Sequence, residues 1–340
     1  MQPTKALDWK NLGFQYLPTH GHVQVEFSEG KWGALQVNRE PFMPMHIAAN
    51  CLHYGQACFE GLKAFTTKSG KIVLFRPERN AGRMQESAAR LMMEAPPTDL
   101  FITACREAVN LNRDFVPPYG TGASMYLRPL LIGTEPTIGI KASSTYSFLV
   151  LVTPVGPYYK DGFHPVEALV MEDYDRAAPK GTGRAKMAGN YAASLKPGYE
   201  AKQKGFPIVL YSDPKENKYV DEFGTSNFIG ITHAGEYKTP DSSSILQSIT
   251  NESLQVLAKE MGLKVIKEPI PIAALDQFKE VGACGTAAVI TPIYAIQSGP
   301  RKFTFGQPNQ AGETLTRLFH ALQAVQYGDT ADTHGWLTAV

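Results

Sequence analysis

A lysine among small residues is the feature of this sequence best suited to covalent chemistry. Residues 184–191 read Arg-Ala-Lys-Met-Ala-Gly-Asn-Tyr, and a glycine-rich connection at 181–183 (Gly-Thr-Gly) precedes them. The small neighbours leave room for a large planar ligand beside the Lys186 amine. That amine becomes a nucleophile only when its pKa falls below the ordinary value of about 10.4, which burial or a nearby cation achieves. A solvent-exposed lysine is the alternative interpretation.

An acidic turn supports a chemical role for Lys186. Residues 221–227 (Asp-Glu-Phe-Gly-Thr-Ser-Asn) begin 35 residues further on (221 − 186) and lead into an apolar strand. An acid at such a turn could sit in a pocket and face a basic ring nitrogen. The alternative is an ordinary turn acid, capped by the hydroxyl of Thr225 or Ser226.

Two other segments offer backbone N–H groups of the kind that hold a phosphate or a carboxylate. Residues 248–252 (Ser-Ile-Thr-Asn-Glu) stand at the start of a predicted helix, and residues 285–288 (Gly-Thr-Ala-Ala) form a predicted turn. A plain helix cap or strand turn is the alternative for either one.

Elements in the first half of the chain follow from its hydrophobic pattern. Met84, Ala88 and Leu91 recur at i, i+4 and i+7, which predicts a helix with one core-facing stripe and directs Arg83 away from that stripe. The predicted strands cover 71–76, 124–131 and 146–153, and the predicted helices cover 78–92 and 98–112. Together they indicate an α+β unit.

The second half of the chain follows a loop at 154–162, where Pro, Gly and Tyr concentrate as they do between packed units. Beyond it the sequence predicts strands at 166–173, 207–212, 263–268 and 279–298, a β-pair over 219–238 with its turn at 233–236, and helices at 191–204, 251–261, 271–278 and 311–326. Neither a GxGxxG nor a GxxxxGK[ST] motif is present, which excludes dinucleotide-binding and P-loop folds.

Composition narrows the class of protein further. A length of 340 residues favours two domains, and 43% hydrophobic with 19% charged residues exclude global disorder. A net charge of +1 provides no field to attract nucleic acid or an anionic membrane. No apolar run approaches the roughly 18 residues of a membrane span, and the first residues lack a secretory pattern, so we expect a soluble, cytoplasmic protein. The four cysteines lack CxxC spacing, and we expect neither a disulfide nor a metal site.

Seven motifs, the first of them made of two short segments, form a pattern that none of them carries alone. They are 53–55 (His-Tyr-Gly) with 59–61 (Phe-Glu-Gly), 74–77 (Leu-Phe-Arg-Pro), 83–84 (Arg-Met), 126–129 (Tyr-Leu-Arg-Pro), 186–191 (Lys-Met-Ala-Gly-Asn-Tyr), 222–227 (Glu-Phe-Gly-Thr-Ser-Asn) and 285–287 (Gly-Thr-Ala). In this order they resemble the fold type IV family of pyridoxal-phosphate enzymes, and most closely its branched-chain amino-acid aminotransferases. The resemblance runs over most of the chain.

The resemblance implies a fold. It is an α/β fold of the α+β type, with a smaller N-terminal α/β domain over 1–153 and a larger C-terminal domain over 164–340 that binds the cofactor and has a β-barrel-like core. The active site would lie between the two domains. The interdomain loop at 154–163 would line its entrance, and glycines at 156 and 162 would let it close over substrate.

The resemblance also implies pyridoxal 5′-phosphate as the cofactor. Lys186 would form a Schiff base with its aldehyde and then move the proton between the substrate Cα and the cofactor. Glu222 would keep the pyridine nitrogen protonated, Tyr191 would hydrogen-bond the ring hydroxyl, and Arg83 would bind the phosphate. Further cofactor contacts would come from Thr225, the N–H groups of Ile249 and Thr250, and the Thr286 hydroxyl.

A substrate pocket is implied as well. Its apolar wall, sized for a branched side chain, would consist of Phe59, Tyr126 and Tyr191, although core packing is the alternative for Phe59 and Tyr126 taken singly. Thr286 and the Ala287 N–H would hold the substrate carboxylate. Arg128 would neutralise the second carboxylate of glutamate at the pocket rim. Tyr54 would enter from the neighbouring subunit, which implies a homodimer or a higher homo-oligomer.

Two segments depart from the family pattern. Residues 246–251 (Leu-Gln-Ser-Ile-Thr-Asn) replace the more usual Pro-Gly and trailing Arg at Gln247, Ser248 and Asn251, so the phosphate cup would have a different shape. The residues after Thr286 lack the paired cysteines of mammalian members. We therefore expect no redox regulation there and a structural role for Cys284.

The expected function is the transfer of the amino group of L-leucine, L-isoleucine or L-valine to 2-oxoglutarate, which gives branched 2-oxo acids and L-glutamate. A same-fold D-amino-acid aminotransferase or aminodeoxychorismate lyase is the second hypothesis, although such chains are typically shorter. A non-catalytic protein that binds a partner is the third. It is disfavoured because Lys186, Glu222, Arg83 and Tyr191 are all of chemically suitable types.

Overall fold

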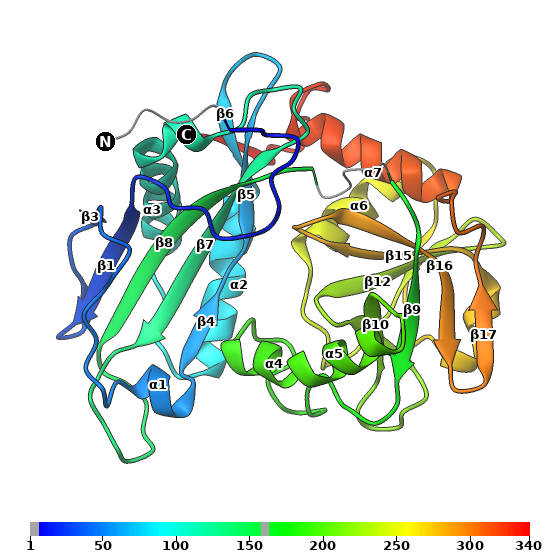
Figure 1. The fold of residues 1–340 in the computed structure, drawn as a ribbon, viewed down its shortest axis with the longest axis horizontal. Coiled ribbons are helices and arrows are strands. Elements are labelled where there is room, and N and C mark those ends of the chain that lie inside the picture. Colours follow the sequence, from blue (N-terminus) through cyan, green and yellow to red (C-terminus); the bar gives the residue numbers. More distant parts are fainter. Residues whose placement is uncertain (1–6, 158–162) are drawn as a thin grey trace. The chain divides into compact units, whose positions relative to one another are not determined.

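The computed structural model describes residues 7–157 and 163–340, which divide into two compact units. Of these residues, unit 1 contains 7–157, 185–188 and 324–340, and unit 2 contains 163–184 and 189–323. Figure 1 traces the elements along the chain. Strand β8 (Tyr146–Val155) runs into the start of the predicted interdomain loop. Residues 158–162 of that loop lie outside the described residues.

Unit 1 is built on an antiparallel sheet in the order β18-β6-β5-β7-β8-β1-β2, with β3 paired to β1 and β4 paired to β7. Its central strands are β7 (Ser124–Gly133) and β8, which pair along their whole length. The other strands are β1 (His22–Ser28), β2 (Lys31–Trp32), β3 (Gln36–Asn38), β4 (Ala57–Phe59), β5 (Leu62–Thr66), β6 (Ile72–Phe75) and β18 (Leu337–Ala339).

Two helices cover one face of this sheet, α2 (Pro77–Arg90) and α3 (Thr98–Leu111) (Figure 1). Pro77 starts α2 at its first turn, where the missing N–H breaks no hydrogen bond. Met84 and Ala88 are buried in the core against the sheet, as the predicted stripe requires. The shorter elements of unit 1 are α1 (Asn50–Tyr54) and a 3₁₀ turn, Arg113–Phe115.

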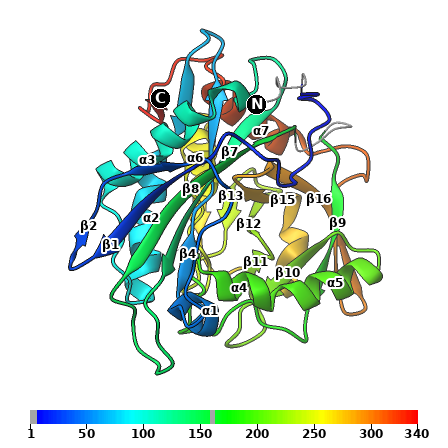
Figure 2. The same ribbon diagram turned by 60° about the vertical axis from the view of Figure 1, so that its left-hand side comes forward.

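Unit 2 is built on a closed barrel. Strands β11-β10-β9-β16-β15-β12 follow one another in the sheet, and β11 also pairs with β12, which closes the ring (Figure 2). These six strands are β9 (Val166–Met171), β10 (Ile208–Ser212), β11 (Val220–Phe223), β12 (Ser226–Thr232), β15 (Phe278–Gly285) and β16 (Val289–Ser298). Phe223, Phe228 and Phe278 fill the interior. The predicted barrel-like core is confirmed.

Further strands and helices surround the barrel. The strands are β13 (Tyr237–Thr239), β14 (Val265–Lys267) and β17 (Arg301–Thr304), and the helices are α4 (Ala188–Ala193), α5 (Leu195–Gln203), α6 (Ile249–Glu260), α7 (Glu313–Gln326) and a 3₁₀ turn, Ile272–Gln277. The single helix predicted over 191–204 is wrong, because α4 and α5 break at Ser194. Pro197 has no N–H to donate to a carbonyl four residues earlier, so it lies in the first turn of a new helix.

Other boundaries also differ from the predictions. The β-pair over 219–238 is three strands, β11, β12 and β13. The short helix predicted near 271–278 is present as a 3₁₀ helix, Ile272–Gln277, whereas the pattern predicts none of the strands β1 to β5. Short strands such as β2 and β3 carry too few residues for an alternation to be visible.

Within residues 7–157 and 163–340, no helix is both long and apolar enough to cross a membrane. The same residues contain no group of three or more His, Cys, Asp or Glu side chains arranged to hold a metal ion.

Candidate active site

The backbone of Lys186 is held on both sides within unit 1. Its N–H donates to the Ser87 hydroxyl at 2.9 Å, and Ser87 is fully buried on α2. Its carbonyl accepts a hydrogen bond from the Phe59 N–H at 3.0 Å, at the end of β4. The neighbouring Met187 bridges to Cys58 as a single antiparallel pair. Because both peptide groups are fixed, the position from which the Lys186 side chain projects is fixed as well.

The Lys186 amine lies in surroundings that disfavour its charge. Its Nζ atom is 4.9 Å from the centre of the Phe59 ring. Lys186 as a whole is half-buried, but its amine is packed among other atoms. This burial lowers the pKa of Lys186 to about 8. The Arg83 guanidinium adds to the effect, while Glu60 opposes it. The lysine can therefore shed its proton near neutral pH, as a nucleophile or a base must.

Glu60 and Arg83 form a buried ion pair beside this lysine. The Arg83 Nε atom lies 2.8 Å from Oε1 of Glu60, and Nη2 lies 2.7 Å from Oε2. The Asn80 side-chain amide donates to Oε2 at 2.7 Å. Both ions are nearly or fully inaccessible to solvent, and each offsets the cost of burying the charge of the other. Sequence reasoning selected Arg83 and quoted Glu60 only as part of a motif.

Arg128, Tyr126 and Phe59 form a second cluster of unit 1. The Arg128 guanidinium lies 4.7 Å from the centre of the Phe59 ring, and its Nη2 donates to the Tyr126 hydroxyl at 3.0 Å. Tyr126 leans over the turn between β4 and β5, where a Cβ on Gly61 would lie 2.2 Å from its hydroxyl oxygen. Only glycine leaves room for this tyrosine. The structure thus brings together Lys186, Phe59, Arg83, Tyr126 and Arg128.

Tyr54 lies apart from this cluster, at the end of α1. Its side chain is 39% exposed, and its hydroxyl donates to the carbonyl of Ile138. Ile138 is itself 75% exposed. The structure of the single chain therefore leaves Tyr54 and its contact at the surface.

In unit 2, Glu222 lies on β11 with its carboxylate held by three groups. The Leu246 N–H donates to Oε1 at 2.8 Å, and the Asn227 side-chain amide donates to Oε2 at 3.0 Å. Nε of Arg176 forms an ion pair with Oε1 at 2.9 Å. Burial raises the pKa of Glu222 to about 7, while Arg176 and the Leu246 N–H oppose the rise. The carboxylate is fixed in position, and a cation placed beside it would favour its ionised form.

Helix α6 begins at Ile249, within the predicted helix start at 248–252. Ser248 caps the helix, and its hydroxyl accepts the Asn251 N–H at 3.2 Å. Ile249 and Thr250 are the first two residues of the helix, whose N–H groups precede the intrahelical hydrogen bonds. Such a terminus favours an anion.

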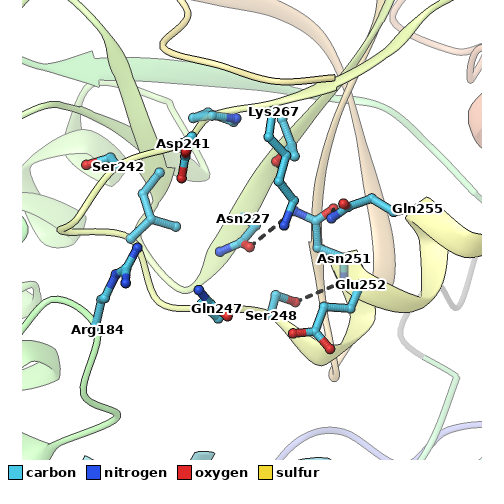
Figure 3. A pocket seen from close by; sticks show the side chains of 13 residues that line it. Arg184, Asn227, Asp241, Ser242, Gln247, Ser248, Asn251, Glu252, Gln255 and Lys267 are labelled. Atoms are coloured by element: carbon cyan, nitrogen blue, oxygen red, sulfur yellow. Dashed lines mark hydrogen bonds between the residues drawn. The ribbon is translucent and has the colours of Figure 1, made fainter. Parts of the chain in front are cut away.

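Asn251 connects this terminus to Glu222. Its side-chain amide donates to the Asn227 side chain at 3.3 Å, and Asn227 in turn donates to Glu222. The Tyr237 hydroxyl donates to the side-chain oxygen, Oδ1, of Asn251 at 2.7 Å. Figure 3 shows Asn227, Ser248 and Asn251 along one wall of a polar pocket. Asn251, one of the departures from the family pattern, is thus part of a buried hydrogen-bond chain.

The remaining predicted residues lie at turns and on α4. Tyr191 is half-buried on α4, and Thr225 is exposed in the turn between β11 and β12. Thr286 and Ala287 lie in the turn between β15 and β16. This turn ends at Val289, whose φ of 65° places a β-branched residue in the left-handed region. Backbone strain of this kind occurs where a turn must present its groups in one orientation.

Comparisons with known proteins point to one family over nearly the whole chain. The family described as amino-transferase class IV matches residues 57–296. The branched-chain-amino-acid aminotransferase of Haemophilus influenzae is 45% identical over 342 residues, which cover 99% of each chain. That of Helicobacter pylori is 43% identical and covers both chains fully.

Solved structures give the same result. The branched-chain amino acid aminotransferase of Escherichia coli has a TM-score of 0.77 at 27% identity and covers 94% of this chain and 98% of its own. The T.th. enzyme of the same name, complexed with N-(5′-phosphopyridoxyl)-L-glutamate, also has a TM-score of 0.77, at 25% identity, with 95% of this chain and 99% of its own covered.

Proposed function

The chain belongs to the class IV aminotransferases, with the predicted fold type IV architecture, and from this premise we propose that it transfers amino groups between branched-chain L-amino acids and 2-oxoglutarate. The observation that carries the proposal is the state of Lys186. Its backbone is fixed by Ser87 and Phe59, and its amine has a pKa of about 8. A lysine with a fixed backbone and a lowered pKa can attack the carbonyl group of a cofactor and can transfer a proton near neutral pH.

The residues of both units fit pyridoxal 5′-phosphate. Bound to the enzyme, this cofactor supplies an aldehyde for the amine and an electron sink for the charge that develops when the substrate loses its α-proton. Lys186 would hold the cofactor and carry the proton to and from the substrate Cα. Glu222 would accept the pyridinium N–H, and its ionised form, which burial disfavours, would be stabilised by that cation.

Phosphate binding would fall to groups with different chemistry. Arg83 would contribute a guanidinium whose plane is fixed by Glu60. The N–H groups of Ile249 and Thr250 would contribute the positive end of α6, a helix of 12 residues. Thr225 and Thr286 would add hydroxyls, and Tyr191 would hydrogen-bond the ring hydroxyl.

Substrate binding would use the aromatic residues. Phe59, Tyr126 and Tyr191 would contact the branched side chain, while Thr286 and the Ala287 N–H would hold the carboxylate. Arg128, whose guanidinium is already placed by the Tyr126 hydroxyl, would meet the second carboxylate of glutamate. Tyr54, exposed in the single chain, would act from the partner subunit of a homodimer.

A donor panel tests this proposal. The purified holoenzyme is assayed with 2-oxoglutarate and the L- and D-forms of leucine, isoleucine and valine, with alanine as the small control, and glutamate formation is measured. We expect turnover with the three branched L-amino acids and none with the D-forms. Turnover of D-amino acids only would favour a same-fold D-amino-acid aminotransferase. A holoenzyme that converts no amino acid and releases no glutamate would contradict the proposal.

A further inference from the structure

Arg176, which the sequence analysis did not select, lies where three segments of unit 2 meet. It occupies the loop between β9 and α4, and it is only 8% exposed. Its Nε atom pairs with Glu222 at 2.9 Å and lies 3.8 Å from Asp221. Its Nη2 atom donates to the carbonyl of Gly183 at 3.0 Å and also to the carbonyl of Ser244. One guanidinium thus contacts the β11 acids and two separate loops.

The two loops approach each other at their backbones. A Cβ on Gly183 would lie 2.0 Å from the Ser244 carbonyl oxygen, so only glycine permits the approach. Carbonyl oxygens withdrawn from water need a donor, and Nη2 of Arg176 supplies one to both loops. Ser244 is fixed further, since its hydroxyl donates to Asp221 at 2.7 Å.

Each of these segments leads to a residue proposed to bind the cofactor. Gly183 precedes Lys186 by three residues, and Ser244 precedes the α6 cap, Ser248, by four. Glu222 is the proposed partner of the pyridine nitrogen. A planar guanidinium has donors in fixed directions, so it can hydrogen-bond a carboxylate and two carbonyl oxygens at once. The ammonium group of a lysine has no such fixed set of donors.

We propose that Arg176 is a positioning residue for transamination: it keeps the Glu222 carboxylate ionised and aimed, and it fixes to that carboxylate the loops that lead to Lys186 and α6. This inference rests on the proposed function. It predicts that the charge of Arg176 and its geometry contribute separately to cofactor binding.

The groups around Glu222 allow the charge contribution to be measured. Arg176 and Asp221 lie beside it: Arg176 lowers the pKa of Glu222 and Asp221 raises it, and burial raises the pKa of Asp221 itself. Cys284 on β15 is fully buried, and burial raises the pKa of its thiol well above its usual range, with Glu222 adding to the rise. Burial raises the pKa of Tyr211 on β10 to about 12, although Arg176 opposes the rise. Cys284 and Tyr211 therefore keep their protons in the range where Glu222 titrates.

The test measures the affinity of the full-length protein, freed of cofactor, for pyridoxal 5′-phosphate as a function of pH. Arg176→Gln removes both the charge and the planar guanidinium with its fixed donors, whereas Arg176→Lys keeps only the charge. The control, Arg317→Gln, removes an exposed arginine on α7. For Arg176→Gln we expect the dissociation constant to rise about tenfold or more relative to the unsubstituted protein. Thermal unfolding of each cofactor-free variant reports its folding.

The pH dependence separates charge from structure. Arg176 lowers the pKa of Glu222, which is about 7 in its presence, so without Arg176 this pKa rises and a larger fraction of the variant than of the unsubstituted protein carries a protonated Glu222 at about pH 7.5. The affinity loss of Arg176→Gln should be largest there and shrink towards about pH 9.5 as its Glu222 ionises. Arg176→Lys, which keeps the charge, should show a smaller loss with little dependence on pH.

Two results would overturn the inference. One is an Arg176→Gln protein that binds the cofactor as tightly as the Arg317→Gln control. The other is a loss that is equal at every pH in both Arg176 variants, since that would indicate a structural effect alone. If Arg176→Gln does not fold, the Arg176→Lys comparison still decides, because an unchanged affinity there would exclude the geometric contribution. An unsubstituted protein that fails to bind the cofactor would instead contradict the proposed function.

Discussion

At the scale of single residues, the charges around Lys186 decide how its amine behaves. Burial and Arg83 lower its pKa, and Glu60 limits the fall by neutralising Arg83 at 2.7 Å. A protonated amine is therefore poorly solvated in the folded protein. The folded protein is therefore more stable at high pH, where Lys186 is deprotonated, than at low pH, where the amine carries a charge.

Replacing this amine by an apolar side chain tests that balance. In the folded state the pKa of Lys186 is about 8, below the ordinary value of about 10.4, so between these values the unfolded chain binds more protons and stability rises with pH. Lys186→Met removes this dependence. We expect the variant to lose activity and, in its cofactor-free form, to be more stable than the cofactor-free unsubstituted protein below about pH 8, with the gain shrinking towards about pH 10.5.

Urea unfolding of both cofactor-free proteins at several pH values provides the measurement. Lys204→Met, at an exposed lysine beyond α5, is the matched control for the loss of a lysine side chain. A stability difference that is the same at every pH would mean that Lys186 has an ordinary pKa.

Residues identified from the sequence and residues missed by it differ in kind. Lys186, Glu222 and the α6 terminus stand in local patterns that a reader of the sequence can recognise. Ser87 and Arg176 do not, because Ser87 meets Lys186 across 99 positions and Arg176 meets Ser244 across 68. A serine on a helix and an arginine in a loop carry no local signal of such partners. The predicted roles of the site residues remain predictions until they are measured.

At the scale of elements, the turn from β4 to β5 determines where Tyr126 lies. Gly61 in this turn has no room for a side chain, and the Tyr126 hydroxyl that occupies the space accepts from Arg128. Gly61 in the segment 59–61 therefore meets a packing requirement. A single residue also explains the break at Ser194. Pro197 has no N–H to donate, so one helix does not continue through this segment although its sequence pattern is helical.

Gly61→Ala should displace Tyr126 and with it Arg128. We expect the KM for 2-oxoglutarate to rise more than the KM for leucine, because the second carboxylate loses its partner, and the free energy of unfolding to fall by about 1–3 kcal/mol through overpacking. Gly82→Ala on α2 is the control. A Cβ there meets nothing within 4 Å, so this variant should be neutral or slightly stabilised. Equal kinetics in both variants would contradict the assigned role of Tyr126 and Arg128.

At the scale of the whole molecule, the surface of unit 1 exposes large apolar side chains near Tyr54. They include Ile47 at 84% exposed, Leu52 at 60%, Ile138 at 75% and Ile140 at 90%. The Tyr54 hydroxyl joins α1 to the segment at 138–140 through the Ile138 carbonyl. Exposed large apolar side chains in such number favour a contact with another protein, and a homodimer would cover them.

We predict a mass of two chains in analytical ultracentrifugation. Ile140→Asp should shift the equilibrium towards single chains and lower activity, because a charge placed in an apolar interface is costly. Val256→Asp, at a partly exposed position on α6, should leave the mass unchanged. A single-chain mass with full activity in the unsubstituted protein would contradict the dimer and the role of Tyr54.

The most direct test of the central claim is to locate the lysine that holds the cofactor. The holoenzyme is treated with borohydride, which converts the linkage into a stable amine, and the peptides are mapped by mass spectrometry. Lys63 on β5 is an internal competitor, since burial lowers its pKa to about 8 as well. We predict one phosphopyridoxyl group per chain, on Lys186. A label on Lys63, or a reduced protein without any labelled lysine, would contradict the account.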